Sequence, residues 1–409
     1  MTDAPDRLVR IRERGSTTVS LSRLQALELR AMNVCSVQPT TSPAEWVVSD
    51  VRSVGNIALD GARVVIDPKV PLRSILYMAS VADRQVNVTD AHFEVAEERD
   101  IPTAITAAFI SAVEQATKRG LSKGYRTAEE SAMVVRGRWD VSRQLRTRPG
   151  MPLPVELTID DFTEDTDENR MLATALAMLR RLDFLPPDLE DRCLALQALF
   201  AEVTTLRPGE RMPIVRPTRL NAHLQFPLFL AGVLLTRASW TTAIGAHRAG
   251  TFLIDMAQVF EAFVGVTLER KLAPRGFIIE LQDQRSWRFD EAGQIILRPD
   301  IVIRDHGTPI VVADTKYKTW GTGGSPPNAD VYQATAYALA AGLKESHLIY
   351  VNGDVESATY DIRSASLRIY AHSLPLDGAP SELDAAIARL GEDMVTSART
   401  FGVVVGASI

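Results

Sequence analysis

The sequence has little cysteine, no long apolar run and no excess of basic residues, and each shortage excludes a class of protein. Only Cys35 and Cys193 occur, far apart, so a disulfide framework and a thiolate zinc site are both excluded, and we expect a cytoplasmic protein. The longest apolar run, Phe226 to Leu235, is far shorter than the roughly 20 residues that a membrane-spanning helix needs. The opening residues Met1 to Asp6 lack the basic start and apolar core of a signal peptide.

Basic residues are also too few for a tight, free-standing DNA-binding protein, because the net charge is −6. For a nuclease this charge is unusual, and it is what we expect if a partner supplies most of the contact with DNA. The charge is uneven, with basic residues gathered from Lys118 to Arg148 and acidic residues from Glu156 to Glu168. Solvated helix faces explain this pattern, and so does a basic surface for a phosphate or an acidic partner.

Several chemistries lack their motifs. No G-x-x-x-x-G-K-[ST] string is present, so we expect no nucleotide hydrolysis by this chain alone. The loop from Gly321 to Pro327 has no lysine for a phosphate cradle, and we interpret it as a mobile connection over an active site. No nucleophile-elbow motif supports a Ser-His-Asp site. The histidines are scattered without metal-ligand spacing: His92, His223, His247, His306, His347 and His372.

The length and the changing hydrophobic period predict three segments. Residues 1–95 alternate apolar and polar positions with turn signals such as Asp60-Gly61, which predicts a small antiparallel β domain. Residues 96–248 are mainly helical, with amphipathic stretches at Ile105 to Thr117 and Arg170 to Leu185, the second broken by Pro186-Pro187. Met133 to Trp139 fits either a strand or a short helix. Residues 249–409 alternate helices and strands, which predicts an α/β domain.

The most informative residues lie in two runs rich in Ile and Val, Arg298 to Ile303 and Pro309 to Lys316, which predict two strands joined by a turn. A hairpin would return Asp300 beside Asp314. Residues two apart in a strand share a face, so Asp314 and Lys316 project together. Oxygen ligands of this kind suit Mg²⁺. The alternative is a surface hairpin whose charges are simply solvated.

Three further features favour a site. Asp314 ends a run that fits a buried strand, where a charge needs a partner or a metal. Gln333 and Tyr337 are four residues apart and share one helical face. Glu261 lies within an apolar-periodic helix from Asp255 to Val264, and an ordinary exposed helical glutamate explains it equally well.

These residues resemble the PD-(D/E)XK nuclease signature, here Pro299-Asp300 followed by Asp314-Thr315-Lys316, with the Q-x-x-x-Y element of its RecB-like branch at Gln333 and Tyr337. The order of motifs over about residues 50 to 375 resembles the McrC family, the nuclease subunit of the McrBC modification-dependent (5-methylcytosine) restriction system. The other motifs that carry this resemblance are Gly120-Leu121 with Tyr125, Val135-Arg136-Gly137-Arg138, Glu168-Asn169-Arg170-Met171-Leu172 and Phe260-Glu261-Ala262-Phe263.

The resemblance implies an α/β PD-(D/E)XK domain preceded by a β-rich and helical N-terminal region. It implies Mg²⁺-dependent cleavage of double-stranded DNA containing modified cytosine, with an AAA+ GTPase partner that this chain also stimulates. Asp300, Asp314 and Glu261 would hold Mg²⁺. Lys316 would orient the attacking water, Gln333 would position the lysine or the DNA, and Tyr337 would support it. Double-strand cleavage would bring two nuclease subunits together.

Two other functions remain open. A non-catalytic adaptor would keep the fold and only stimulate a GTPase, although it would have no reason to retain Asp300, Asp314 and Lys316. A RecB-like repair exonuclease shares the Q-x-x-x-Y element. For partner docking, the candidates are Arg136, Arg138 and Arg143, because arginine neutralises charge in nucleotide hydrolysis or pairs with an acidic rim. Salt bridges to the acidic run Asp160 to Glu168 are the simpler explanation for these arginines.

Overall fold

The structure is a computed structural model that describes residues 7–13, 15–42, 44–82, 101–180, 185–207, 209–243, 251–282, 287–318, 326–352 and 357–401. The chain forms two compact units, one from Met1–Ile101 with Leu253–Ile409 and the other from Pro102–Phe252. The first and last of the three segments expected from the sequence therefore lie in the same unit. Residues 321–325 of the expected mobile loop, His92 and His247 lie outside the described residues.

The N-terminal part of the first unit is β-rich, as the alternation predicts. Its elements are β1 (Arg7–Arg12), β2 (Thr17–Ser20), α1 (Arg23–Ala31), β3 (Ser36–Pro39), β4 (Glu45–Ser49), β5 (Ser53–Leu59), β6 (Ala62–Asp67) and α2 (Leu72–Ala82). β5 and β6 form an antiparallel hairpin whose turn is Asp60-Gly61, with Gly61 at a φ of 65°. β2, β4 and β3 form a second antiparallel sheet.

The expectation of a small antiparallel β domain is wrong at one edge of the first sheet. Its order is β1-β6-β5-β10, and β1 runs parallel to β6. Parallel neighbours need a long crossover, which here contains β2, α1, β3, β4 and β5. The fourth strand, β10 (Phe252–Asp255), comes from beyond the second unit in sequence. Local alternation carries no information about either pairing.

The C-terminal part of the first unit is a mixed six-stranded sheet in the order β11-β14-β15-β16-β18-β17. Its elements are α8 (Met256–Leu272), η3 (Ala273–Arg275), β11 (Ile278–Leu281), β12 (Trp287–Arg288), β13 (Ile296–Leu297), β14 (Ile301–Asp305), β15 (Thr308–Lys316), α9 (Asn328–Ala341), β16 (Glu345–Val351), β17 (Ser357–Ile362), β18 (Leu367–Leu374) and α10 (Pro380–Phe401). β15, β16 and β18 run parallel, while β11, β14 and β17 are antiparallel to their neighbours.

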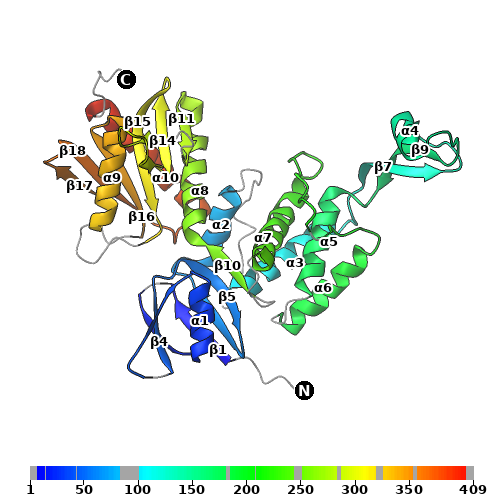
Figure 1. Cartoon of the computed structure of the whole chain (residues 1–409), viewed down its shortest axis with the longest axis horizontal. Coiled ribbons are helices and arrows are strands. Elements are labelled where there is room, and N and C mark those ends of the chain that lie inside the picture. The colour runs from blue at the N-terminus through cyan, green and yellow to red at the C-terminus, as the bar shows by residue number, and fades with distance from the viewer. Residues whose placement is uncertain are drawn as a thin grey trace. The chain divides into compact units, whose positions relative to one another are not determined.

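Helices cover both faces of this sheet (Figure 1). α9 packs Ala334 and Tyr337 against one face of the sheet, which presents Val302 and Val312 of β14 and β15 and Ile369 of β18. α10 lies on the opposite face. Its Ser397 hydroxyl donates to Glu345 of β16 and to the Tyr370 hydroxyl of β18, whose side chains project on that face. α8 packs beside α10 and β11. A Cβ at Gly265 of α8 would lie 2.5 Å from Leu281, so glycine is what permits this close approach.

The β14–β15 hairpin confirms the turn expected between the two Ile- and Val-rich runs. Asp305 pairs with Thr308, so the loop consists of His306 and Gly307, with φ values of 47° and 85°. Two residues at positive φ make the tight turn that matches the twist of antiparallel strands. A register shift beside Pro309 inserts Ile310 as a bulge, after which regular pairing reaches Ala313.

The second unit contains the expected helices and one small sheet in the order β7-β9-β8. Its elements are α3 (Ile101–Thr117), β7 (Gly124–Ala132), β8 (Arg138–Trp139), α4 (Val141–Thr147), β9 (Val155–Thr163), α5 (Asp167–Leu179), α6 (Pro187–Leu199), η2 (Ala222–Leu224) and α7 (Gln225–Ala243). Met133 to Trp139 is neither one strand nor a helix, because only its last two residues pair. α5 ends at Leu179, short of the expected Leu185, and Pro187 begins α6 at a position where proline loses no hydrogen bond.

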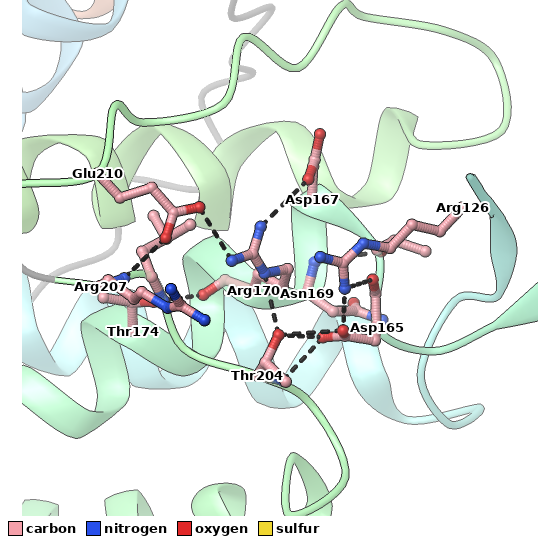
Figure 2. A network of polar contacts seen from close by, with 11 residues as sticks. Arg126, Asp165, Asp167, Asn169, Arg170, Thr174, Thr204, Arg207 and Glu210 are labelled. Carbon is pink, nitrogen blue, oxygen red and sulfur yellow. Dashed lines mark hydrogen bonds and ion pairs between the residues drawn. The ribbon is translucent and has the colours of Figure 1, made fainter. Parts of the chain in front are cut away.

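A polar network fixes the base of the β7–β9 module, defined here as residues 124–163 (Figure 2). Asp165 forms an ion pair with Arg126 of β7 and accepts from the Thr204 amide at 2.8 Å. Arg170 of α5 donates to Thr204 Oγ1 at 3.1 Å and to Glu210 at 3.0 Å. The network therefore joins β7, the start of α5 and the segment that follows α6.

No helix within the described ranges is long and apolar enough to cross a membrane.

Candidate active site

Asp300 lies just before β14 and binds the end of β15. Its Oδ2 accepts hydrogen bonds from the Thr315 amide at 2.8 Å and from the Thr315 hydroxyl at 2.9 Å. The hairpin register places Ile301 opposite Ala313, so Asp300 comes next to Asp314, as expected from the sequence. One oxygen of Asp300 thus has two donors from the neighbouring strand, and these donors fix the direction of the carboxylate.

Asp314 is only 2% exposed and forms an ion pair with Lys316, the last residue of β15. Its buried Oδ2 faces the ammonium and accepts no other hydrogen bond from the described residues. The two side chains project on the same face, as the strand period predicts. This arrangement excludes the alternative of a surface hairpin with solvated charges, because the Lys316 side chain is 19% exposed and that of Asp314 is 3% exposed.

Lys316 is also held from α9. Its Nζ donates to Gln333 Oε1 at 2.8 Å, and Gln333 Nε2 donates to the Tyr337 hydroxyl at 2.7 Å. The Tyr337 hydroxyl in turn donates to the Arg298 carbonyl at 3.0 Å, and burial raises the pKa of Tyr337 to about 12. The helix spacing of four residues therefore allows a chain of hydrogen bonds that runs from the Lys316 ammonium to the Arg298 carbonyl, two residues before Asp300.

Glu261 of α8 faces the same end of the sheet, and its Oε1 accepts from Gln282 Nε2 at 2.9 Å. Burial raises the pKa of Glu261 to about 7, and the negative charges of Asp300 and Asp314 add to this effect. The alternative of an ordinary exposed glutamate does not fit a carboxyl group with these neighbours. Gln282, at a φ of 45°, also donates its amide to the Asp300 carbonyl at 2.9 Å, so it joins α8 to the start of β14.

The two aspartates repel each other in the absence of a cation. Burial raises the pKa of Asp314 to about 6, with a further contribution from Asp300, while Lys316 acts in the opposite direction. Burial also raises the pKa of Asp300, against the lowering effect of the hydrogen bonds from Thr315. A buried pair of carboxylates with raised pKa values is stabilised when a divalent cation binds between them.

These donors fit Mg²⁺, which binds through one or two carboxylates and keeps several waters. Asp300 and Asp314 meet that requirement. Among the described residues, no three His, Cys, Asp or Glu side chains come close enough together to hold one metal ion. The structure therefore brings Asp300 and Asp314 together, but it holds Glu261 on Gln282 rather than beside them as a third ligand.

A second lysine, Lys318, lies two residues beyond the end of β15 and has no role in the sequence-based prediction. Lys318 Nζ contacts Asp330 Oδ1 at 2.9 Å and Oδ2 at 2.8 Å, and the buried Tyr350 hydroxyl donates to Asp330 at 2.7 Å. Asp330 is 5% exposed and lies in the first turn of α9. This cluster fastens the start of α9, three residues before Gln333, to β15 and β16. The spacing of two residues between Asp314, Lys316 and Lys318 was the sequence signal that could have identified this cluster.

The three arginines expected at a docking surface differ from one another. Arg136 pairs with Glu130 at 2.7 Å, and its side chain is 66% exposed. Arg143 contacts Glu129 and the buried Glu156, both at 3.3 Å, and its side chain is 21% exposed. Arg143 therefore helps to hold the β7–β9 module together.

The proposed ion pairs of these arginines with the acidic run from Asp160 to Glu168 are wrong. Lys123 and Arg126 bind that run instead, through Glu164 and Asp165. Arg138 is exposed and forms no ion pair with any described residue.

The chain is similar to the members of one family and to solved structures. The model of one family, described as McrBC 5-methylcytosine restriction system component, matches residues 49–351. A chain in the refined half-complex from a tetradecameric assembly of Thermococcus gammatolerans McrB AAA+ hexamers with bound McrC is 18% identical, with a TM-score of 0.61 over 95% of this chain and 100% of that chain. A chain of the Thermococcus gammatolerans McrBC complex is 19% identical, with a TM-score of 0.41 over 65% of this chain and 88% of that chain. No curated protein matches.

At 18% identity, the first of these likenesses shows a shared fold. The family match is broader evidence, since it spans both compact units and the strands that carry Asp300, Asp314 and Lys316. The chain therefore belongs to the family of McrBC 5-methylcytosine restriction system components.

Proposed function

We propose that this chain is the nuclease subunit of a modification-dependent restriction complex and hydrolyses phosphodiesters in DNA that contains 5-methylcytosine. The observation that carries the proposal is the meeting of Asp300, Asp314 and Lys316 at one end of β15, with Gln333 hydrogen-bonded to the lysine. A charged group this well buried has a high cost unless it has a task or a partner. Buried titratable groups with shifted pKa values cluster at active sites.

Each side chain has a task in the hydrolysis. Asp300 and Asp314 would hold Mg²⁺, which supplies an activated water and neutralises charge on the phosphate oxygens. Lys316 donates to the water or to the developing negative charge, because its ammonium is a compact donor with three N–H groups. Gln333 keeps that ammonium at the end of β15, and Tyr337 keeps the Gln333 amide turned toward it. Glu261 is proposed to act on the metal from α8, through water.

We also propose that the chain works with an AAA+ GTPase, since the Thermococcus gammatolerans chain of the same fold is bound to AAA+ hexamers. The β7–β9 module is the candidate docking surface. It exposes apolar side chains far beyond what its small core requires, and large exposed apolar patches mark interaction sites. The exposed apolar side chains of the module include Tyr125, Val134, Val135, Trp139, Leu145 and Phe162.

The proposed site contains one set of catalytic side chains and therefore cuts one strand. Double-strand cleavage then requires two copies of this chain at the same DNA, which an oligomeric partner would supply.

The test is a cleavage assay with the full chain, its co-encoded AAA+ partner, GTP and Mg²⁺ on methylated and unmethylated plasmids. We expect cleavage of the methylated plasmid only. Asp300→Ala should abolish it, while the matched control Asp361→Ala should not, because the Asp361 side chain is 72% exposed on β17. Equal cleavage by the wild-type and Asp300→Ala proteins would contradict the assigned site.

A further inference from the structure

The end of β15 has fewer neighbours than its middle. Pairing with β14 reaches Ala313, and pairing with β16 reaches Lys316. Within the described part of the chain, the carbonyl group of the next residue, Tyr317, accepts no hydrogen bond from a strand. Beyond Lys316, the Lys318 carbonyl still accepts from the Val351 amide of β16 at 3.3 Å, so Tyr317 lies between two residues bonded to β16. Because Tyr317 directly follows Lys316, any movement of its backbone changes the backbone from which the Lys316 side chain projects.

Lys69, which follows β6 in the N-terminal sheet, supplies the missing partner. Its Nζ donates to the Tyr317 carbonyl at 2.9 Å and lies 3.6 Å from the centroid of the Tyr317 ring. A cation over an aromatic face adds attraction to that hydrogen bond. The two residues are 248 positions apart in sequence, so this contact ties the N-terminal sheet to the strand that carries Asp314 and Lys316.

Glu13, which follows β1, holds Lys69 in place. Its side chain is 1% exposed, and its Oε2 accepts from the Lys69 amide at 2.9 Å and from the Tyr317 hydroxyl at 3.4 Å. Oε1 lies 3.7 Å from Lys69 Nζ and accepts no hydrogen bond from the residues that the structure describes. The backbone amide of Glu13 donates to the Asp67 carbonyl at the end of β6, and this hydrogen bond fixes the position of Glu13.

The same tyrosine also touches α8. The rings of Tyr317 and Phe260 have centroids 5.9 Å apart, and Phe260 precedes Glu261 in the helix. Tyr317 thus contacts the two elements that carry Lys316 and Glu261, and Lys69 and Glu13 hold it from the N-terminal sheet.

We propose that Lys69 and Glu13 are positioning residues for hydrolysis, which act through Tyr317 on the placement of Lys316. This inference rests on the proposed nuclease function. It makes the N-terminal sheet part of the catalytic unit rather than a separate module.

Stability alone does not explain a buried ion pair at this position. Desolvation of two charges offsets most of their attraction, so a hydrophobic pair of similar volume is often equally stable. The position of Tyr317 is a different matter, because a hydrophobic side chain at position 69 has no donor for the Tyr317 carbonyl and would leave it without this hydrogen bond. A displacement of about 1 Å at a reacting group is enough to lower a rate by about a hundredfold.

The test compares Lys69→Met, Lys69→Arg and the double variant Lys69→Met/Glu13→Gln in the full chain with its AAA+ partner. The double variant removes both charges, so no carboxylate is left buried without a partner. Arg73→Met is the matched control, because Arg73 Nη2 also donates to a distant carbonyl, that of Asp377, at 2.8 Å. Melting temperature, kcat and KM are measured for each variant.

We expect Lys69→Met and the double variant to lower kcat by about ten- to a hundredfold with KM changed by less than about twofold. Lys69→Arg should recover most of the loss, since guanidinium retains the hydrogen bond and the stacking on Tyr317. Arg73→Met should leave kcat unchanged. A double variant with wild-type kcat, or an equal loss of kcat in Arg73→Met, would overturn the proposal.

Hydrogen exchange separates this inference from the proposed function. In Lys69→Met, amides of the peptide covering residues 308–318 should exchange about tenfold faster than in the wild type and in Arg73→Met. If the wild-type complex cuts no DNA, the proposed function fails while this readout still decides the positioning of β15. Unchanged exchange in Lys69→Met would overturn the positioning role, whatever the activity.

Discussion

Lys316 Nζ donates to Gln333 Oε1 at 2.8 Å, so an amide on α9 determines where the ammonium at the end of β15 lies. The amide cannot turn over freely, because its nitrogen donates to Tyr337 at 2.7 Å. Lys316 is therefore placed by a helix as well as by its own strand.

Gln333→Ala should lower kcat by about ten- to a hundredfold, because the lysine loses the acceptor that positions it. Tyr337→Phe should have a smaller effect, about two- to fivefold, since it frees only the far side of the amide. Steady-state cleavage of methylated DNA measures both. Tyr332→Ala is the control on the same helix, with Tyr332 69% exposed. A rate for Gln333→Ala within twofold of wild type would remove Gln333 from the mechanism.

Local sequence was sufficient for the centre of this site. Asp300 and Asp314 are brought together by one hairpin with a two-residue turn, and such hairpins are encoded by nearby residues. Gln333 and Tyr337 share a helical face and match the Q-x-x-x-Y element, and the structure confirms only that they contact each other. Glu261 was identified by resemblance. Its partner Gln282 was missed, because a contact between a helix and a residue after a strand leaves no periodic pattern in either sequence.

The N-terminal half shows the limit of such inference. Alternation predicted the β5–β6 hairpin, but not the parallel pairing of β1 with β6 or the addition of β10. The contact of Lys69 with Tyr317 depends on that arrangement, so it too has no local signal. Surface ion pairs were equally hard to assign, since the partners of Arg136 and Arg143 are Glu130, Glu129 and Glu156 rather than residues of the run from Asp160 to Glu168.

Glu261 should make the metal-free protein less stable as pH rises. Its folded-state pKa is raised to about 7, so the stability that it contributes when protonated is present below about pH 4 and is lost as pH approaches 7. Glu261→Gln mimics the protonated form. After allowance for solvent screening of a half-buried group, we expect it to add about 1 kcal/mol at pH 8, or roughly 2 °C in melting temperature.

Melting curves in EDTA at pH 5 and pH 8 measure this effect. The gain from Glu261→Gln should be largest at pH 8 and nearly absent at pH 5. Equal gains in melting temperature at both pH values would show that the surroundings of Glu261 do not raise its pKa.

The isolated chain should bind unmodified duplex DNA weakly and hydrolyse no GTP. The net charge is −6 and the sequence contains no phosphate-cradle motif. We expect a dissociation constant weaker than about 1 µM at physiological salt, measured by fluorescence anisotropy. Tighter binding without a partner would contradict the view that the AAA+ subunit supplies most of the DNA contact.

Charge reversal in the β7–β9 module should separate docking from folding. Arg138→Glu changes an exposed side chain and should abolish stimulation of the partner GTPase with the melting temperature unchanged. Arg143→Glu places a second negative charge beside the buried Glu156, 3.3 Å from the present guanidinium, and should unfold the module. Full stimulation by Arg138→Glu would exclude this surface of β8 from docking.

The single-turnover rate of Asp314→Asn on methylated DNA tests the central claim most directly. Asparagine keeps the size of the side chain but loses the charge that pairs with Lys316 and would bind Mg²⁺. With saturating partner, GTP and Mg²⁺, we expect the rate to fall by at least about a thousandfold while the complex still assembles and hydrolyses GTP. A rate within about threefold of wild type, in a complex of the same composition, would show that Asp314 is not part of the active site.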